Sequence, residues 1–142
     1  MAVIKSGYQT GTTVLTLSGL TTLANGSSTT SATVDNTSDQ YLDVLVETIA
    51  TTASGAVATG IVEIYGKGSI DNTDFDDDAN DKWLGSIILG AAGVQTRKRV
   101  VSISAGFGGA MPPFYQIRIR NSSGAALTDG SVSVRGILAQ TV

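Results

Sequence analysis

Apolar and polar residues alternate with a period of two in several short stretches of this chain. The clearest stretch is Phe114–Asn121. One face of it carries Tyr115, Ile117 and Ile119, and the other carries Gln116, Arg118 and Arg120. This period is typical of a β-strand with one buried side and one side that meets water.

Tyr41–Ala50 alternates in the same way, with Leu42, Val44 and Val46 on one side. On the opposite side Asp43 and Glu47 flank Leu45. Leu45 is then an apolar residue on a polar face, which makes it a candidate for contact with a partner.

Eight stretches rich in β-branched or aromatic residues are predicted strands. They are Val14–Ser18, Ser31–Asp35, Tyr41–Ala50, Ile61–Lys67, Trp83–Leu89, Arg97–Ser104, Phe114–Asn121 and Ser131–Leu138. Asp129-Gly130 is predicted to close a hairpin, and residues 76–83 can form a helical turn at most. The prediction is an all-β fold: a single-domain β-sandwich or jelly roll of about eight antiparallel strands over residues 13–142, after an extended arm over residues 1–12.

The composition indicates a folded domain without common catalytic chemistry. The 142 residues are 42% hydrophobic and 15% charged, a balance that argues against disorder. His and Cys are both absent, which removes the commonest general base and the thiol nucleophile. We therefore expect that the protein is not an enzyme and binds no cofactor. No apolar stretch approaches the roughly 18 residues of a membrane span.

Charge is distributed unevenly along the chain. Residues 1–90 hold three Lys or Arg and eleven Asp or Glu, whereas residues 91–142 hold six and one. Arg97-Lys98-Arg99 is the main basic cluster, with Arg97 and Arg99 on one face of a strand and Lys98 on the other. An isoelectric point near 4.6 argues against nucleic-acid binding. Two interpretations of these cations are left: they form ion pairs with a neighbouring molecule, or they belong to an ordinary solvated strand end.

The acidic stretch Asp71–Asp81 suggests a cation site, because Asp74, Asp76 and Asp78 have the alternate spacing of a calcium loop. Ala79 and Gly85 stand where an EF-hand needs Gly and Glu. An EF-hand is therefore excluded. A solvated loop is the favoured interpretation, and no metal site is predicted.

Two other kinds of site are conceivable. The aromatic residues Trp83, Tyr65, Tyr41 and Tyr115 are either a sugar-binding platform or ordinary core residues. Asp43, Glu47 and Glu63 would be the carboxylates of a glycosidase, although nothing in the sequence singles them out.

Four segments together resemble small virion structural proteins of tailed bacteriophages, including capsid decoration (cement) proteins. The segments are Val34–Asp43, Ile64–Asp71, Phe107–Phe114 and Ile119–Leu127. The resemblance implies a jelly roll, a trimer, the major capsid protein as partner, and a place on the capsid surface of the virion after synthesis in the host cytoplasm. The alternative is a tail or fibre module that binds host carbohydrate.

Partner contact is predicted for residues of the arm, one strand face and the basic cluster. These are Val3, Ile4, Lys5, Tyr8, Leu45, Arg97 and Arg99. No catalytic, cofactor-binding or metal-binding residue is predicted.

Overall fold

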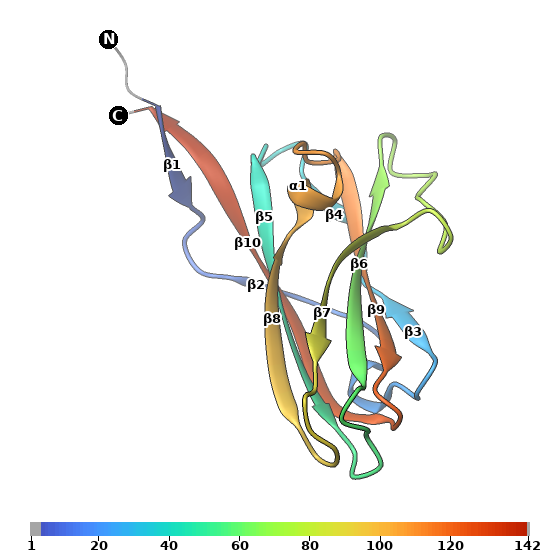
Figure 1. Cartoon of the computed structure of the whole chain (residues 1–142). Coiled ribbons are helices and arrows are strands. Elements are labelled where there is room, and N and C mark those ends of the chain that lie inside the picture. The colour runs from blue at the N-terminus through green and yellow to red at the C-terminus, as the bar shows by residue number, and fades with distance from the viewer. Residues whose placement is uncertain (1–3, 142) are drawn as a thin grey trace.

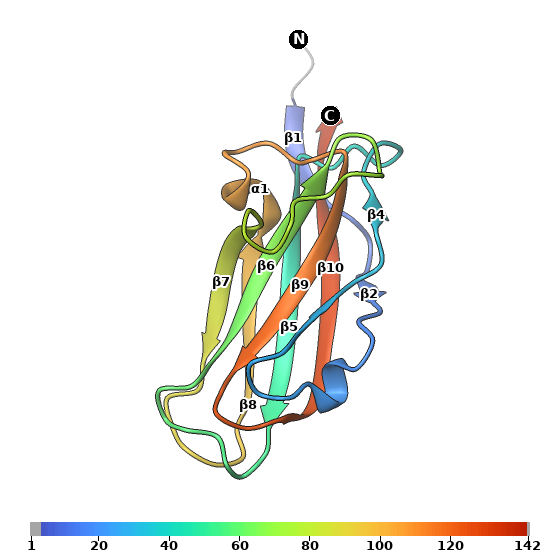
Figure 2. The ribbon, with the colours of Figure 1, turned by 90° about the vertical axis from the view of Figure 1, so that its right-hand side faces the viewer.

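A computed structural model describes residues 4–141, and it describes side chains for residues 6–139. Two antiparallel sheets pack face to face, with sheet 2 in front of sheet 1 in Figure 2. Sheet 1 contains β1 (Ile4–Tyr8), β2 (Thr13–Leu15), β5 (Asp43–Thr52), β8 (Thr96–Ser102) and β10 (Leu127–Thr141). Sheet 2 contains β3 (Ser28–Thr30), β4 (Val34–Asp35), β6 (Ile61–Ser69), β7 (Lys82–Ile88) and β9 (Phe114–Ser122). A 3-10 turn, η1 (Leu20–Thr22), and a short helix, α1 (Ile103–Gly106), lie in the connections (Figure 1).

The strand pairing is nested. If β1 is set aside, the first strand is β2, and it pairs with the last strand, β10. The short strands β3 and β4 both pair with β9. Inside these, β5 pairs with β8, and β6 pairs with β7. This first-with-last order is the arrangement of a jelly roll, in which most connections cross from one sheet to the other.

The core lies between the sheets and consists mainly of inward-facing aliphatic residues. On β5 the alternation leaves Val44 and Val46 almost fully buried, and on β9 it buries Tyr115, Ile117 and Ile119. Burial raises the pKa of the Tyr115 hydroxyl, which stays uncharged in the core. The all-β sandwich prediction is confirmed, with ten strands in the described part of the chain.

Two local predictions are wrong. Asp129-Gly130 does not close a hairpin, because β10 runs straight through it with a β-bulge between Leu127 and Asp129. A side chain at Gly130 would come within 3.0 Å of Leu20 in η1, so glycine here allows close packing rather than a turn. Arg118 also does not lie in water: it is 6% exposed, although it is on the outer face of β9.

A buried asparagine joins the connections at one end of the sandwich. Asn121 is fully buried at the end of β9, and its amide nitrogen donates to Leu23 O and Ala125 O, each at 2.8 Å. Its side-chain oxygen accepts from the backbone N–H of Ser123 at 3.0 Å. One side chain thus connects the segment after η1 to the turn between β9 and β10.

Asn121→Ala is expected to lower the free energy of unfolding by about 3 kcal/mol, because it leaves several buried backbone groups without a partner. Urea denaturation followed by tryptophan fluorescence measures this change. Asn25 accepts only one backbone hydrogen bond and is exposed, so Asn25→Ala should cost less than about 1 kcal/mol. Equal losses in the two variants would contradict the role given to Asn121.

Candidate interaction surfaces

The outer face of sheet 1 carries rows of apolar and polar side chains that do not reach the core. The register places Val14, Ser133, Glu47 and Val100 in one row across β2, β10, β5 and β8. The adjacent row contains Arg135, Leu45 and Ser102. Val14 is 69% exposed and Val100 is 49% exposed. We call these two rows the sheet-1 face.

A shallow groove of about 230 Å³ lies on the sheet-1 face. It is lined by Thr12, Leu45, Glu47, Val100, Ser133, Val134 and Arg135. Charged groups at its border are held by neighbours: Lys98 Nζ lies 3.5 Å from Glu47 Oε2, and Arg135 Nε donates to Gln9 O at 2.9 Å. The groove thus has an aliphatic floor between a carboxylate and a guanidinium group.

The fold brings two of the predicted contact residues to this same side of the molecule. Tyr8 is 60% exposed and lies opposite Ile137 in the register, with the Arg135 guanidinium 5.4 Å from its ring centre. Leu45 is half-buried in the groove, next to Arg135 across the strand pair. Arg135 therefore links Tyr8 to the sheet-1 face, and its role was not foreseen from the sequence.

The other predicted residues lie elsewhere. Ile4 and Lys5 belong to β1, of which only the backbone is described at these positions, and Val3 lies outside the described residues. Arg97 and Arg99 share the side of β8 that faces β7, whereas Lys98 is on the opposite side beside Glu47. Arg97 Nε donates to Leu89 O at 3.2 Å. The predicted alternation of the basic cluster is confirmed, but these two arginines are not on the sheet-1 face.

The outer face of sheet 2 is built differently, around a buried guanidinium group. Arg118 Nε lies 2.6 Å from Asp81 Oδ2, and the side chains of both residues are less than a tenth exposed. The guanidinium group also stacks on Tyr65, 4.2 Å from the ring centre. Burial opposes the charge of Arg118, but the hydrogen bond and the charge of Asp81 outweigh it and raise the pKa of Arg118.

The same network continues through Tyr65 to Glu63. The Tyr65 hydroxyl donates to Glu63 Oε1 at 2.9 Å, and the Ser122 hydroxyl donates to Glu63 Oε2 at 3.0 Å. Burial, followed by this bond to Glu63, raises the pKa of the Tyr65 hydroxyl. Trp83 lies opposite Tyr65 in the register but is 59% exposed, so Trp83 does not belong to the core. A bulge between Ile64 and Tyr65 accompanies this outward orientation of Trp83.

Most carboxylates of the acidic stretch bind groups of the chain itself. Asp71 Oδ1 accepts from the backbone N–H groups of Thr73 and Asp74, and Asp76 Oδ2 accepts from Gly68 N. Asp78 pairs with Lys67, whose hydrogen bond lowers the pKa of that carboxyl group. Within the described part of the chain, no group of three or more His, Cys, Asp or Glu residues is arranged to hold a metal ion.

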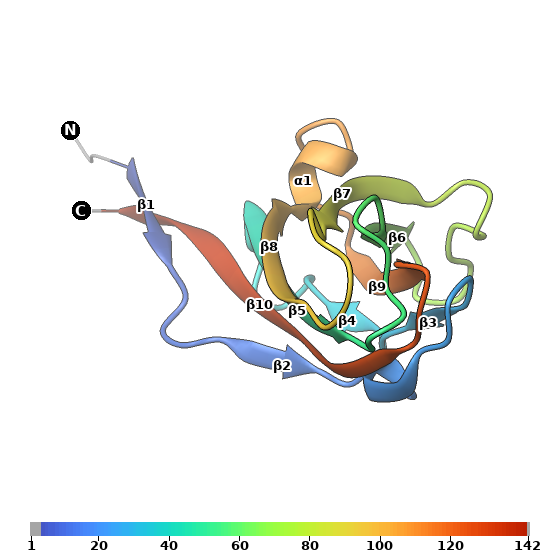
Figure 3. The same ribbon diagram turned by 60° about the horizontal axis from the view of Figure 1, so that its bottom comes forward.

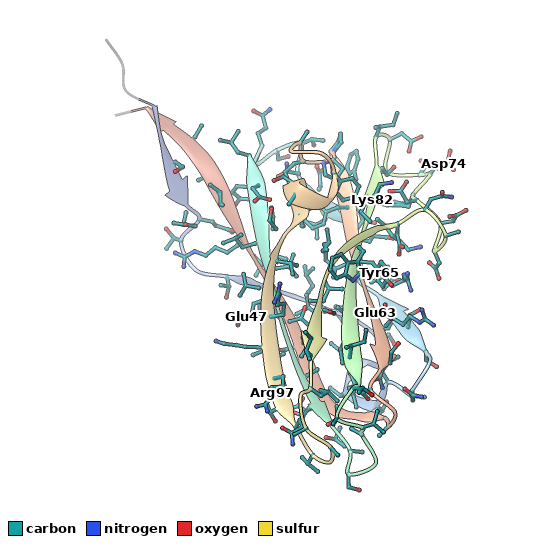
Figure 4. All side chains as sticks on the ribbon, viewed as in Figure 1. Glu47, Glu63, Tyr65, Asp74, Lys82 and Arg97 are labelled. Atoms are coloured by element: carbon teal, nitrogen blue, oxygen red, sulfur yellow. The ribbon has the colours of Figure 1, made fainter. Side chains whose placement is uncertain are left out.

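The carboxylates considered for glycoside hydrolysis do not face one another across a cleft. Asp43 and Glu47 are on the outer face of sheet 1 and Glu63 is on that of sheet 2, as Figure 4 shows for the two glutamates. Asp43 and Glu47 are four residues apart on one strand, about 13 Å, which is longer than the separation either hydrolytic mechanism uses. Asp43 accepts hydrogen bonds from the Ser102 hydroxyl and Ser104 N, so it fixes the start of α1.

Comparisons with known proteins do not assign this chain to a family. No protein-family model matches the chain, and none of the curated proteins matches it. None of the described helices has the length and apolar character needed to cross a membrane.

Arg118→Met is expected to lower the free energy of unfolding by about 3 kcal/mol, because the buried Asp81 carboxylate loses its counter-charge. The double variant Arg118→Met/Asp81→Leu should recover most of that loss in urea denaturation. Arg120 is on the same face of β9 but half exposed, 3.7 Å from Glu63, so Arg120→Met should cost less than about 1 kcal/mol. A double variant no more stable than Arg118→Met would show that the lost packing, not the unpaired carboxylate, is responsible.

Proposed function

We propose that this protein is a structural, non-enzymatic component of a tailed-bacteriophage virion that binds the outside of the assembled capsid and stabilises it. The observation that carries the proposal is the sheet-1 face, where Val14 and Val100 are exposed and half-buried Leu45 lies in a groove bordered by Glu47 and Arg135. Exposed apolar residues gathered on one face are a common mark of a protein-binding surface. The resemblance of four segments to decoration proteins supports the capsid as the partner.

The proposed mechanism is mass action. A protein that binds only the assembled shell stabilises it by about 2.7 kcal/mol per site when its concentration is a hundred times Kd. If the protein is a trimer, it touches several capsid subunits at once and gains avidity. Nothing in this role requires turnover, which agrees with a chain that has neither His nor Cys.

The second candidate is a tail or fibre module that binds carbohydrate, and exposed Trp83 favours it, since an aromatic ring stacks on sugar CH groups. Two observations on the same face weigh against it. One side of the neighbouring Tyr65 ring is covered by Arg118. Both oxygens of Glu63 already accept a hydrogen bond from a protein hydroxyl, and the side chain is only 16% exposed, so little of this carboxylate is offered to a sugar.

The number of copies per purified particle separates the two candidates, measured by quantitative mass spectrometry against the major capsid protein. A decoration role predicts a fixed ratio close to that of the capsid protein. A handful of copies per particle would favour the tail or fibre module instead, and absence from particles would overturn both.

Val100→Asp should weaken binding to purified shells at least roughly tenfold, because a carboxylate would have to lose water in the contact. Ile88→Asp is the matched control: Ile88 is 67% exposed on β7 of sheet 2, so the same charge is added on the opposite outer face. Co-sedimentation with shells measures both affinities. Equal weakening by the two variants, or none by Val100→Asp, would show that the sheet-1 face is not the docking face.

A further inference from the structure

The strand pair β1–β10 projects beyond the sandwich. The pairing of β10 with β5 ends at Ile137 and Asp43, whereas its pairing with β1 continues to Ile4 and Thr141. Figures 1 and 3 show this two-stranded ribbon leaving the body of the molecule. We call residues 4–8 and 138–141 the ribbon.

The direction of the backbone groups in the ribbon follows from one hydrogen bond. Gln9 N donates to Gly136 O directly across the pair at 2.8 Å. Hydrogen-bonded and non-hydrogen-bonded pairs alternate along an antiparallel ladder, so Gly7–Leu138 is hydrogen-bonded and Ser6–Ala139 is not. The backbone groups of Ser6 therefore point away from β10, and those of Ala139 point away from β1.

The ribbon consequently has two open edges in the described part of the chain. One is the outer edge of β1, which pairs only with β10. The other is the edge of β10 over residues 138–141, beyond the last β5 pair and the bond from Leu42 N to Ile137 O. Both edges are about one short strand in length, and each displays unpaired N–H and C=O groups.

Such edges are normally protected, and this ribbon carries little protection. Natural edge strands carry charges, prolines or bulges that prevent pairing with another chain. The ribbon has no proline, and Lys5 is its only charged residue. A two-stranded ribbon is marginally stable by itself in water, so this one gains stability if further strands join it.

The two edges are complementary to each other under rotation. In a ring of copies related by a rotation axis, all β10 strands run in one sense along the axis and all β1 strands run in the opposite sense. The open edge of β10 in one copy therefore meets the open edge of β1 in the next copy as an antiparallel pair. Closing the ring leaves no free edge, as in a β-barrel.

We propose that the ribbons of several copies of this chain join edge to edge, β10 of one copy against β1 of the next, into a closed antiparallel barrel. The occupant of the open edge is a second copy, because the same short segment offers both halves of the contact. The edge contact uses backbone groups of the ribbon, which lie outside the two rows of the sheet-1 face. Ring formation is measured without shells, so its failure is distinguishable from a failure of shell binding.

The test replaces the outward N–H groups without disturbing the pairing inside one copy. Ser6→Pro and Ala139→Pro each remove an N–H that faces an open edge, a position at which proline is tolerated in a strand. Ser6→Ala and Ala139→Ser change the same side chains but keep the N–H. Sedimentation velocity over a concentration series measures assembly, and far-ultraviolet circular dichroism verifies the fold of each variant.

The wild-type protein is expected to form a ring of three or more copies, and each proline variant should raise the dissociation constant at least roughly tenfold relative to its matched control. In the assembled wild-type protein, the amides of Ser6, Tyr8 and Ala139 should exchange more slowly with deuterium than in the proline variants. A wild-type monomer or dimer would overturn the proposal. So would proline variants that assemble as well as Ser6→Ala and Ala139→Ser.

Discussion

The pairing of β10 is the constraint on which the rest of the structure depends. This strand of 15 residues pairs with β5 along one edge and with β2 and β1 along the other, so it fixes the register of most of sheet 1. Its bulge and Gly130 allow Leu20 of η1 to pack close to the sheet. Because β10 extends beyond the end of β5, the same strand also forms the projecting ribbon with β1.

The two outer faces are distinguished by how their polar groups are satisfied. On sheet 2, Arg118, Asp81, Tyr65 and Glu63 form a closed network in which charges and hydroxyl groups bind one another. On sheet 1, aliphatic side chains remain accessible between the charged pair Lys98–Glu47 and Arg135. Sheet 2 also exposes Ile88 and Trp83 outside this network, whereas the aliphatic side chains of sheet 1 line a groove and gain free energy when it is covered. This contrast is why the docking proposal uses sheet 1.

Much of the fold could be predicted because it follows local rules. The alternation at Phe114–Asn121 correctly identified Tyr115, Ile117 and Ile119 as core residues, and the basic cluster alternates as expected. Arg118 was mistaken for a solvated residue because its neighbour Tyr65 and its counter-charge Asp81 come from distant parts of the chain. The sequence left open whether Trp83 is a core residue or part of a sugar platform, because the bulge that accompanies its outward orientation is not visible in the spacing of residues.

The sequence by itself determined the class of fold. Its segments alternate apolar and polar residues with a period of two and are separated by turn-forming residues, and such segments bury their apolar faces only as packed sheets. It also determined the absence of imidazole and thiol chemistry. Only the tertiary structure decided which residues share a face. Tyr8 and Leu45 both lie beside Arg135, whereas Arg97 and Arg99 lie together on the other side of sheet 1. The physical reason is that a strand's neighbours are set by long-range pairing, and alternation within one strand carries no information about which strand lies beside it.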